Sequence, residues 1–145
     1  MERIASFTVD HNVLVPGLYL SRRDGNVVTF DLRFKKPNTG DLLTNAEMHS
    51  VEHVIATLLR NSPRKDAVVY FGPMGCQTGF YFLFDGAQLS ESEAVALVQQ
   101  VFARGAAYDG EMPGKSAAEC GNYRNLDVDT GRAVCGFYAG LIQDW

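Results

Sequence analysis

An alternation of apolar and polar residues runs through the segment NVVTFDLRFKK, residues 26–36. The apolar positions are Val28, Phe30, Leu32 and Phe34, and the polar positions between and after them are Thr29, Asp31, Arg33 and Lys35. A period of two predicts a strand with one buried face. Asp31 and Arg33 are therefore expected to point away from that core. The Pro, Asn and Gly of the following PNTGD are expected to end the strand.

Two helices are predicted by capping patterns that precede apolar residues at helical spacing. The first begins at TNAE (residues 44–47) and runs to about Asn61. The second begins at SESE (residues 90–93) and runs to about Arg104. A short terminal helix is predicted over residues 130–143, where apolar side chains again recur at helical spacing.

The remaining apolar segments predict a hairpin. AVVYF (67–71) and TGFYFLF (78–84) read as strands, and GPMGC (72–76) between them reads as a tight loop. Residues 105–125 are expected to be mostly loop. Together these elements predict an α+β fold, in which helices pack on one face of a few-stranded antiparallel sheet. With 145 residues, of which 46% are hydrophobic, the chain is expected to form a single domain over residues 1–145.

Charge and composition narrow the classes of function. The chain carries 13 basic and 17 acidic residues, a net charge of −4, with no basic run that could follow a phosphate backbone. We therefore expect no nucleic-acid partner. No segment approaches the roughly 20 apolar residues of a membrane span or resembles a signal peptide, so we expect a cytoplasmic protein. In that compartment Cys76, Cys120 and Cys135 would stay reduced, as candidate ligands or nucleophiles.

The HSVEH segment on the first predicted helix is the main candidate for chemistry. His49 and His53 are four residues apart, so both imidazoles can lie on one face and bind one metal ion, with Glu52 beside His49. The pattern H-x-x-E-H also occurs in inverzincin peptidases, in which the glutamate is the general base. Two helix histidines with no ligand are an equally open interpretation at this stage.

Two of the cysteines lie in loops that suit chemistry. Cys120, in the glycine-bearing AECGNYRN, is a candidate third ligand that would leave one position of a tetrahedral metal site open. It could also be an inert buried thiol. Cys76, in GPMGCQTG, could transfer protons as a thiolate if a cation such as Arg33 lay nearby. The alternative is a turn built by the glycines, with the cysteine as filler.

Five motifs in order make the chain resemble a known family. SFTVDH, FDLRF, HSVEH, GPMGCQTGFY and ECG, between Ser6 and about Leu126, resemble the LuxS family of S-ribosylhomocysteine lyases. The resemblance implies that His49, His53 and Cys120 bind one divalent metal per subunit, natively Fe²⁺ and readily Zn²⁺ or Co²⁺.

The resemblance also implies a reaction, roles and a partner. S-ribosylhomocysteine would be cleaved to homocysteine and 4,5-dihydroxy-2,3-pentanedione, the precursor of the autoinducer-2 signals of quorum sensing. Cys76 and Glu52 would transfer the protons, and Ser6, His11 and Arg33 would lie on the substrate side. Members of the family are homodimers with active sites at the subunit interface.

Two departures and two rival functions accompany the resemblance. Tyr70 stands where many relatives carry an aspartate, so a substrate contact there would be lost or supplied differently, and the end at Trp145 is expected to trim the last helix. An inverzincin peptidase would need a glutamate as third ligand, for which Glu119 is available. A structural metal site would need a fourth ligand, and His11 is the only other histidine.

Overall fold

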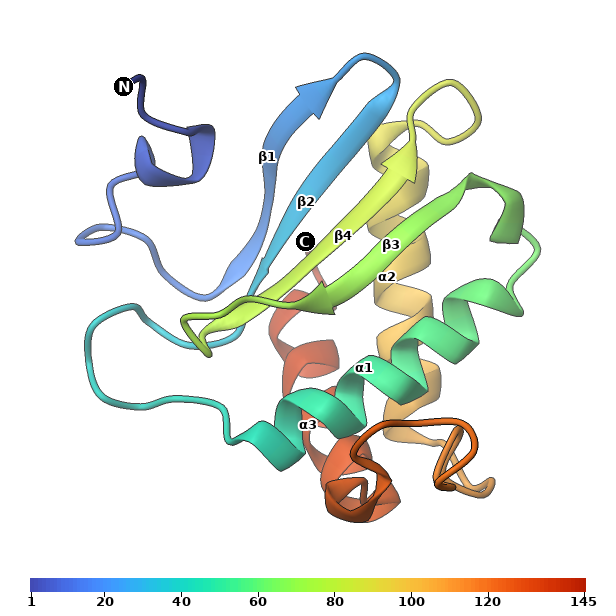
Figure 1. The fold of residues 1–145 in the computed structure, drawn as a ribbon. Coiled ribbons are helices and arrows are strands. Elements are labelled where there is room, and N and C mark those ends of the chain that lie inside the picture. Colours follow the sequence, from blue (N-terminus) through green and yellow to red (C-terminus); the bar gives the residue numbers. More distant parts are fainter.

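The computed structural model describes residues 1–145, and its three α-helices lie on one side of a single four-stranded antiparallel sheet (Figure 1). The elements in chain order are β1 (Gly17–Asp24), β2 (Val27–Arg33), α1 (Asn45–Arg60), β3 (Val68–Pro73), β4 (Gly79–Asp85), α2 (Glu91–Ala106) and α3 (Val128–Ile142). Short 3-10 helices lie at Ala5–Phe7, Lys65–Ala67 and Tyr123–Asn125. The predicted α+β fold is therefore confirmed. None of the helices is both long and apolar enough to span a membrane.

The sheet has the order β1-β2-β4-β3, so the two strands with the clearest alternation lie in its centre. Their buried apolar side chains all face the helices: Val28, Phe30, Leu32, Phe80, Phe82 and Phe84. Just beyond β2, Phe34 stacks on Tyr138 of α3 with ring centroids 4.0 Å apart. The periodicity that predicted β2, and the apolar composition that predicted β4, thus reflect the core between sheet and helices.

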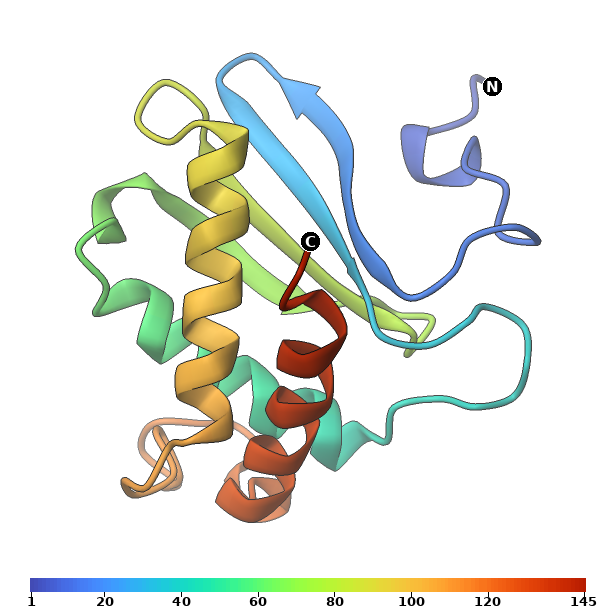
Figure 2. The ribbon, with the colours of Figure 1, turned by 180° about the vertical axis from the view of Figure 1, so that it is seen from behind.

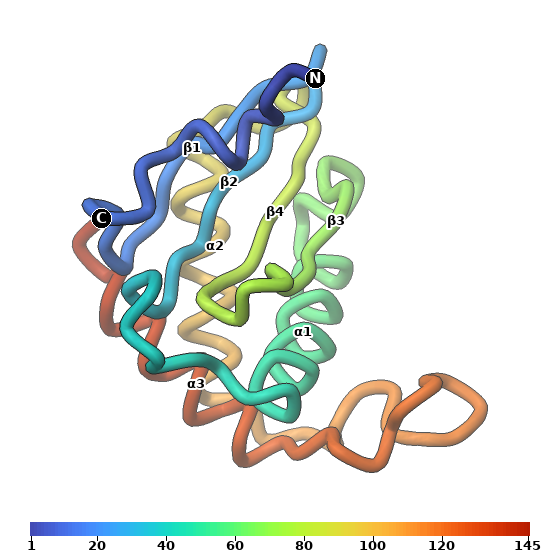
Figure 3. The backbone as a smooth tube through the Cα atoms, turned by 60° about the vertical axis from the view of Figure 1, so that its left-hand side comes forward, coloured from blue at the N-terminus to red at the C-terminus, as the bar shows by residue number.

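Both predicted capping boxes are present at the starts of α1 and α2. At α1 the Thr44 hydroxyl accepts from the backbone N–H of Glu47, and the Glu47 carboxylate accepts from that of Thr44. Helices α2 and α3 run across the sheet in Figure 2, with α1 beyond them. The segment between α2 and α3, drawn in orange, loops out beside α1 (Figure 3). It is this loop that meets the HSVEH face of α1.

The strand β1 was not predicted, and its pairing explains why. It is an edge strand in which only Gly17 and Leu18 are buried, and its register against β2 shifts between Leu20 and Arg22. A bulge of this kind interrupts the alternation by one residue. The sequence GLYLSRRD therefore lacks a period of two, although its backbone pairs with β2 along its whole length.

The face of β2 that is not covered by helices carries two buried charged side chains. Asp31 and Arg33 do lie on the face opposite the core, as the alternation predicts, yet both are buried, with Arg33 only 2% exposed. Asp31 pairs in register with Tyr19 of β1 on one side and Tyr81 of β4 on the other. These flanking side chains shield charges that an isolated strand would leave in water.

Candidate functional site

Three side chains converge where α1 meets the loop after α2. The ligand atoms of His49, His53 and Cys120 all lie within 4.8 Å of one another, and Cys120 Sγ is 3.3 Å from His49 Nε2. The two imidazoles are one helical turn apart on α1, with ring centroids separated by 4.6 Å. All three residues are half-buried. The predicted ligand set is therefore brought together by the fold.

The second nitrogen of each imidazole is already engaged. His49 Nδ1 lies 2.6 Å from Asn125 Oδ1, and His53 Nδ1 lies 2.8 Å from the backbone carbonyl of Pro113. Because both partners are oxygens that only accept, each Nδ1 donates and each Nε2 keeps its lone pair for a metal. Gly114, at φ +71°, permits this approach, since a Cβ there would come within 2.9 Å of His53 Nδ1.

The donor set fits a catalytic divalent metal. Two neutral imidazoles and one thiolate are ligands that Zn²⁺, Fe²⁺ and Co²⁺ accept, and three protein ligands leave a coordination position free. Glu52 lines the adjoining cavity of about 250 Å³ together with His49. Glu119 is exposed, accepts a hydrogen bond from Ser116 and is not part of the cluster, so the ligand set required by an inverzincin peptidase is not assembled.

Cys76 lies on the turn between β3 and β4. Strand β3 extends to Pro73 and β4 begins at Gly79, so the turn lies two residues further along the chain than the sequence predicts, and Gln77 lies in it at φ +64°. Gln77 also donates from its side-chain amide to the carbonyl of Leu43, which ties the turn to the segment before α1. Cys76 is exposed and lines a cavity of about 460 Å³ together with His11.

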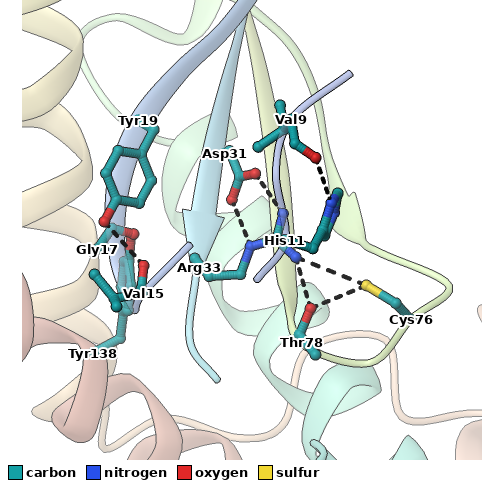
Figure 4. A network of polar contacts seen from close by, with 10 residues as sticks. All are labelled: Val9, His11, Val15, Gly17, Tyr19, Asp31, Arg33, Cys76, Thr78 and Tyr138. Carbon is teal, nitrogen blue, oxygen red and sulfur yellow. Dashed lines mark hydrogen bonds and ion pairs between the residues drawn. The ribbon is translucent and has the colours of Figure 1, made fainter. Parts of the chain in front are cut away.

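Arg33 lies beside this thiol, inside a network of polar contacts (Figure 4). Its guanidinium donates to both carboxylate oxygens of Asp31, at 3.1 and 2.5 Å, and to Thr78 Oγ1 at 2.7 Å. The distance from Arg33 to Cys76 Sγ is 3.9 Å. Burial, and next the Asp31 carboxylate, raise the pKa of Tyr81 above its usual value. The cation expected near Cys76 is present, but its charge is paired.

The predicted site residues line different cavities of the single chain. The metal cluster adjoins Glu52, whereas Cys76 and His11 share another cavity. Ser6 lines a third cavity, over β1, β2 and β4. Cys135 is completely buried, which raises the pKa of its thiol to about 12.

Four contributors were missed from the sequence. Asp31 had one usable signal, because its i, i+2 spacing from Arg33 places both on one face of a strand. Thr78, Asn125 and Pro113 had none. Their roles arise from contacts between segments 45 to 76 residues apart in sequence.

Comparisons with known proteins agree with these observations. Residues 4–140 match the family model described as S-Ribosylhomocysteinase (LuxS). An S-ribosylhomocysteine lyase of Desulfotalea psychrophila is 48% identical over 149 aligned positions, which cover 99% of this chain and 93% of the relative. The enzyme of the same name from Finegoldia magna is 43% identical, covering 99% and 94%. That of Clostridium beijerinckii is 46% identical, covering 88% and 83%.

Proposed function

The chain belongs to the LuxS family, and on that premise we propose that it is an S-ribosylhomocysteine lyase, a carbon–sulfur lyase that releases homocysteine and 4,5-dihydroxy-2,3-pentanedione. The observation that carries the proposal is the cluster of His49, His53 and Cys120 within a family match that spans nearly the whole chain. The pentanedione is the precursor of autoinducer-2, so the reaction joins the recycling of methyl-cycle products to quorum sensing.

The substrate dictates what the residues have to do. The carbon–sulfur bond of the thioether breaks readily only when a carbonyl lies next to the carbon that loses a proton. The carbonyl therefore has to move along the ribose from C1 to C3 before the thiol is eliminated. Each move takes a proton from one position and returns it at a neighbouring one. Groups that exchange protons with carbon and oxygen are therefore required, and each contributes about 10²- to 10⁴-fold to the rate.

Cys76 and Glu52 are the proposed proton-transfer groups. Cys76 is exposed on its turn with Arg33 and Thr78 beside it, and Glu52 faces the cavity next to His49. His49, His53 and Cys120 are the proposed ligands of one divalent ion, Fe²⁺ in the native enzyme, with Zn²⁺ or Co²⁺ as substitutes. Such an ion, when bound, supplies a Lewis acid for the sugar oxygens.

The working enzyme is proposed to be a homodimer with its sites at the interface. The N-terminal segment supports this, because it carries six large apolar side chains that are exposed in the single chain: Met1, Ile4, Phe7, Val9, Val13 and Val15. Ser6 and His11, the proposed substrate-side residues together with Arg33, belong to the same segment. The three free cysteines support a reducing cytoplasmic location.

The test is release of homocysteine from S-ribosylhomocysteine, with metal analysis of the same sample. Cys120→Ala should lose metal and turnover together. Cys76→Ala and Glu52→Gln should keep the metal and lose at least about 10²-fold in turnover. Cys135→Ala, which removes a buried thiol outside the site, is the matched control and should retain activity. Absence of homocysteine release by the metal-loaded protein would refute the proposal.

A further inference from the structure

Thr78 lies between the buried cation and the exposed thiol. Its Oγ1 is 2.7 Å from an Arg33 guanidinium nitrogen and 3.0 Å from Cys76 Sγ (Figure 4). The residue is 3% exposed, so its hydroxyl has no competing bulk water. Thr78 is thus the only side chain that contacts both groups of this pair at hydrogen-bond distance.

The chemistry of the groups fixes the direction of the first of these hydrogen bonds and leaves the hydroxyl proton available for the second. A guanidinium can only donate, so the Thr78 oxygen accepts from Arg33. The single hydroxyl proton of Thr78 is then free for its other neighbour, the Cys76 sulfur. A thiolate can only accept, so this arrangement is complementary to the ionised form of Cys76. Donation by the cation polarises the hydroxyl and strengthens the second bond.

Arg33 by itself is poorly placed for the same task. It is 3.9 Å from Cys76 Sγ, and two of its nitrogens donate to the Asp31 carboxylate, which offsets its charge. The other titratable groups toward the thiol are Tyr81 of β4 and His11, which lines the same cavity. The close donor to the sulfur is therefore a neutral hydroxyl rather than a charged side chain.

We propose that Thr78 is a positioning residue. Its hydroxyl accepts a hydrogen bond from Arg33 and donates one to the Cys76 sulfur, which holds the thiol in its ionised form and fixes the position of the sulfur. The proposal rests on the role given to Cys76 in the proposed lyase reaction. It assigns to Arg33 an indirect effect, exerted through Thr78.

The test is the pH dependence of alkylation of Cys76 by iodoacetamide, followed by mass spectrometry of the peptide that contains it. Thr78→Val keeps the shape of the side chain and removes the hydroxyl. It should move the midpoint of the alkylation profile upward by about one pH unit, the effect of losing one hydrogen bond to a charged group. Thr78→Ser should restore the midpoint. Ser62→Ala, which removes another buried hydroxyl, is the control and should leave it unchanged.

An unchanged or lower midpoint in folded, metal-containing Thr78→Val would overturn the proposal, because it would mean that Arg33 serves the thiolate without help. A serine variant that fails to restore the midpoint would overturn it as well. If the valine variant does not fold, Thr78→Ala carries the same expectation. Alkylation needs no substrate, so these outcomes are independent of lyase activity. An unaltered protein that releases no homocysteine would refute the proposed function and leave the alkylation result to decide the role of Thr78.

Discussion

Replacing Asn125 with leucine should weaken metal binding about tenfold while leaving the three proposed ligands in place. Asn125 Oδ1 accepts from His49 Nδ1 at 2.6 Å, and its amide nitrogen donates to Asn45 Oδ1, also at 2.6 Å. These two successive hydrogen bonds hold the His49 ring with Nε2 toward Cys120. Leucine has a similar size and offers no acceptor.

The magnitude follows from how the two imidazoles are supported. Loss of a residue that orients a metal ligand costs about 10- to 100-fold in affinity, or roughly 1.4 to 2.7 kcal/mol. Only His49 would be affected, because His53 donates to the backbone carbonyl of Pro113, which a change at Asn125 leaves intact. Water can partly replace the lost acceptor, since Asn125 is half-buried. We therefore expect the lower end of the range.

The assay is competition for Zn²⁺ against a chromophoric chelator, supported by the visible spectrum of the Co²⁺-substituted protein. Asn125→Asp keeps an acceptor oxygen and should retain the affinity, which separates orientation of His49 from simple loss of packing. Asn45→Ala should have a smaller effect, because it removes only the outer support. Equal affinities of the leucine variant and the unaltered protein would refute the idea that Asn125 orients the ligand.

Three predictions concern stability, all measured by urea unfolding. Asp31→Asn should lower the free energy of unfolding by about 3 kcal/mol, because buried Arg33 loses its counter-ion; an unchanged value would contradict this. Gly105→Ala should cost about 1 to 3 kcal/mol, since its Cβ would lie 2.8 Å from Cys135 Sγ, and adding Cys135→Ala should recover part of the loss. Hydrogen bonds from the Thr130 hydroxyl, and next from the Thr130 backbone N–H, lower the pKa of Asp127. The contribution of the Asp127 carboxylate to the free energy of unfolding should therefore be complete above about pH 4 and disappear as the pH falls through the lowered pKa. Asp127→Asn should flatten that pH dependence; an equal slope would assign it to other carboxylates.

The elements that could be predicted from sequence are those whose signals are local. The capping boxes that begin at Thr44 and Ser90 each involve only a few consecutive residues, and α1 and α2 begin directly after these two residues. Alternation predicted β2, and an apolar, aromatic-rich segment predicted β4, because one face of each strand is buried under the helices. The strand β1 gave no such signal, because its order depends on pairing with β2 rather than on its own burial pattern.

The site was predictable in the same uneven way. Helical spacing is enough to place His49 and His53 together, whereas Cys120 depends on the path of a loop without periodicity. The same loop supplies Asn125 and the Pro113 carbonyl, which select the metal-binding nitrogen of each imidazole. Spacing therefore identifies ligands on one helix, and tertiary structure decides how they are oriented.

The thiol network depends on the same strand pairing that builds the core. In β2, Leu32 faces the helices and Arg33 the opposite side, and Arg33 is opposite Gly79 of β4, next to Thr78. Gly79 is required there because a Cβ would lie 2.3 Å from the Leu32 carbonyl oxygen. A slip of one residue in this pairing would move every core side chain of the strand to the wrong face and take Thr78 away from Arg33. The packed core and the contact of Thr78 with Arg33 thus depend on one register, so a substitution at Gly79 should damage folding and the reactivity of the Cys76 thiol together.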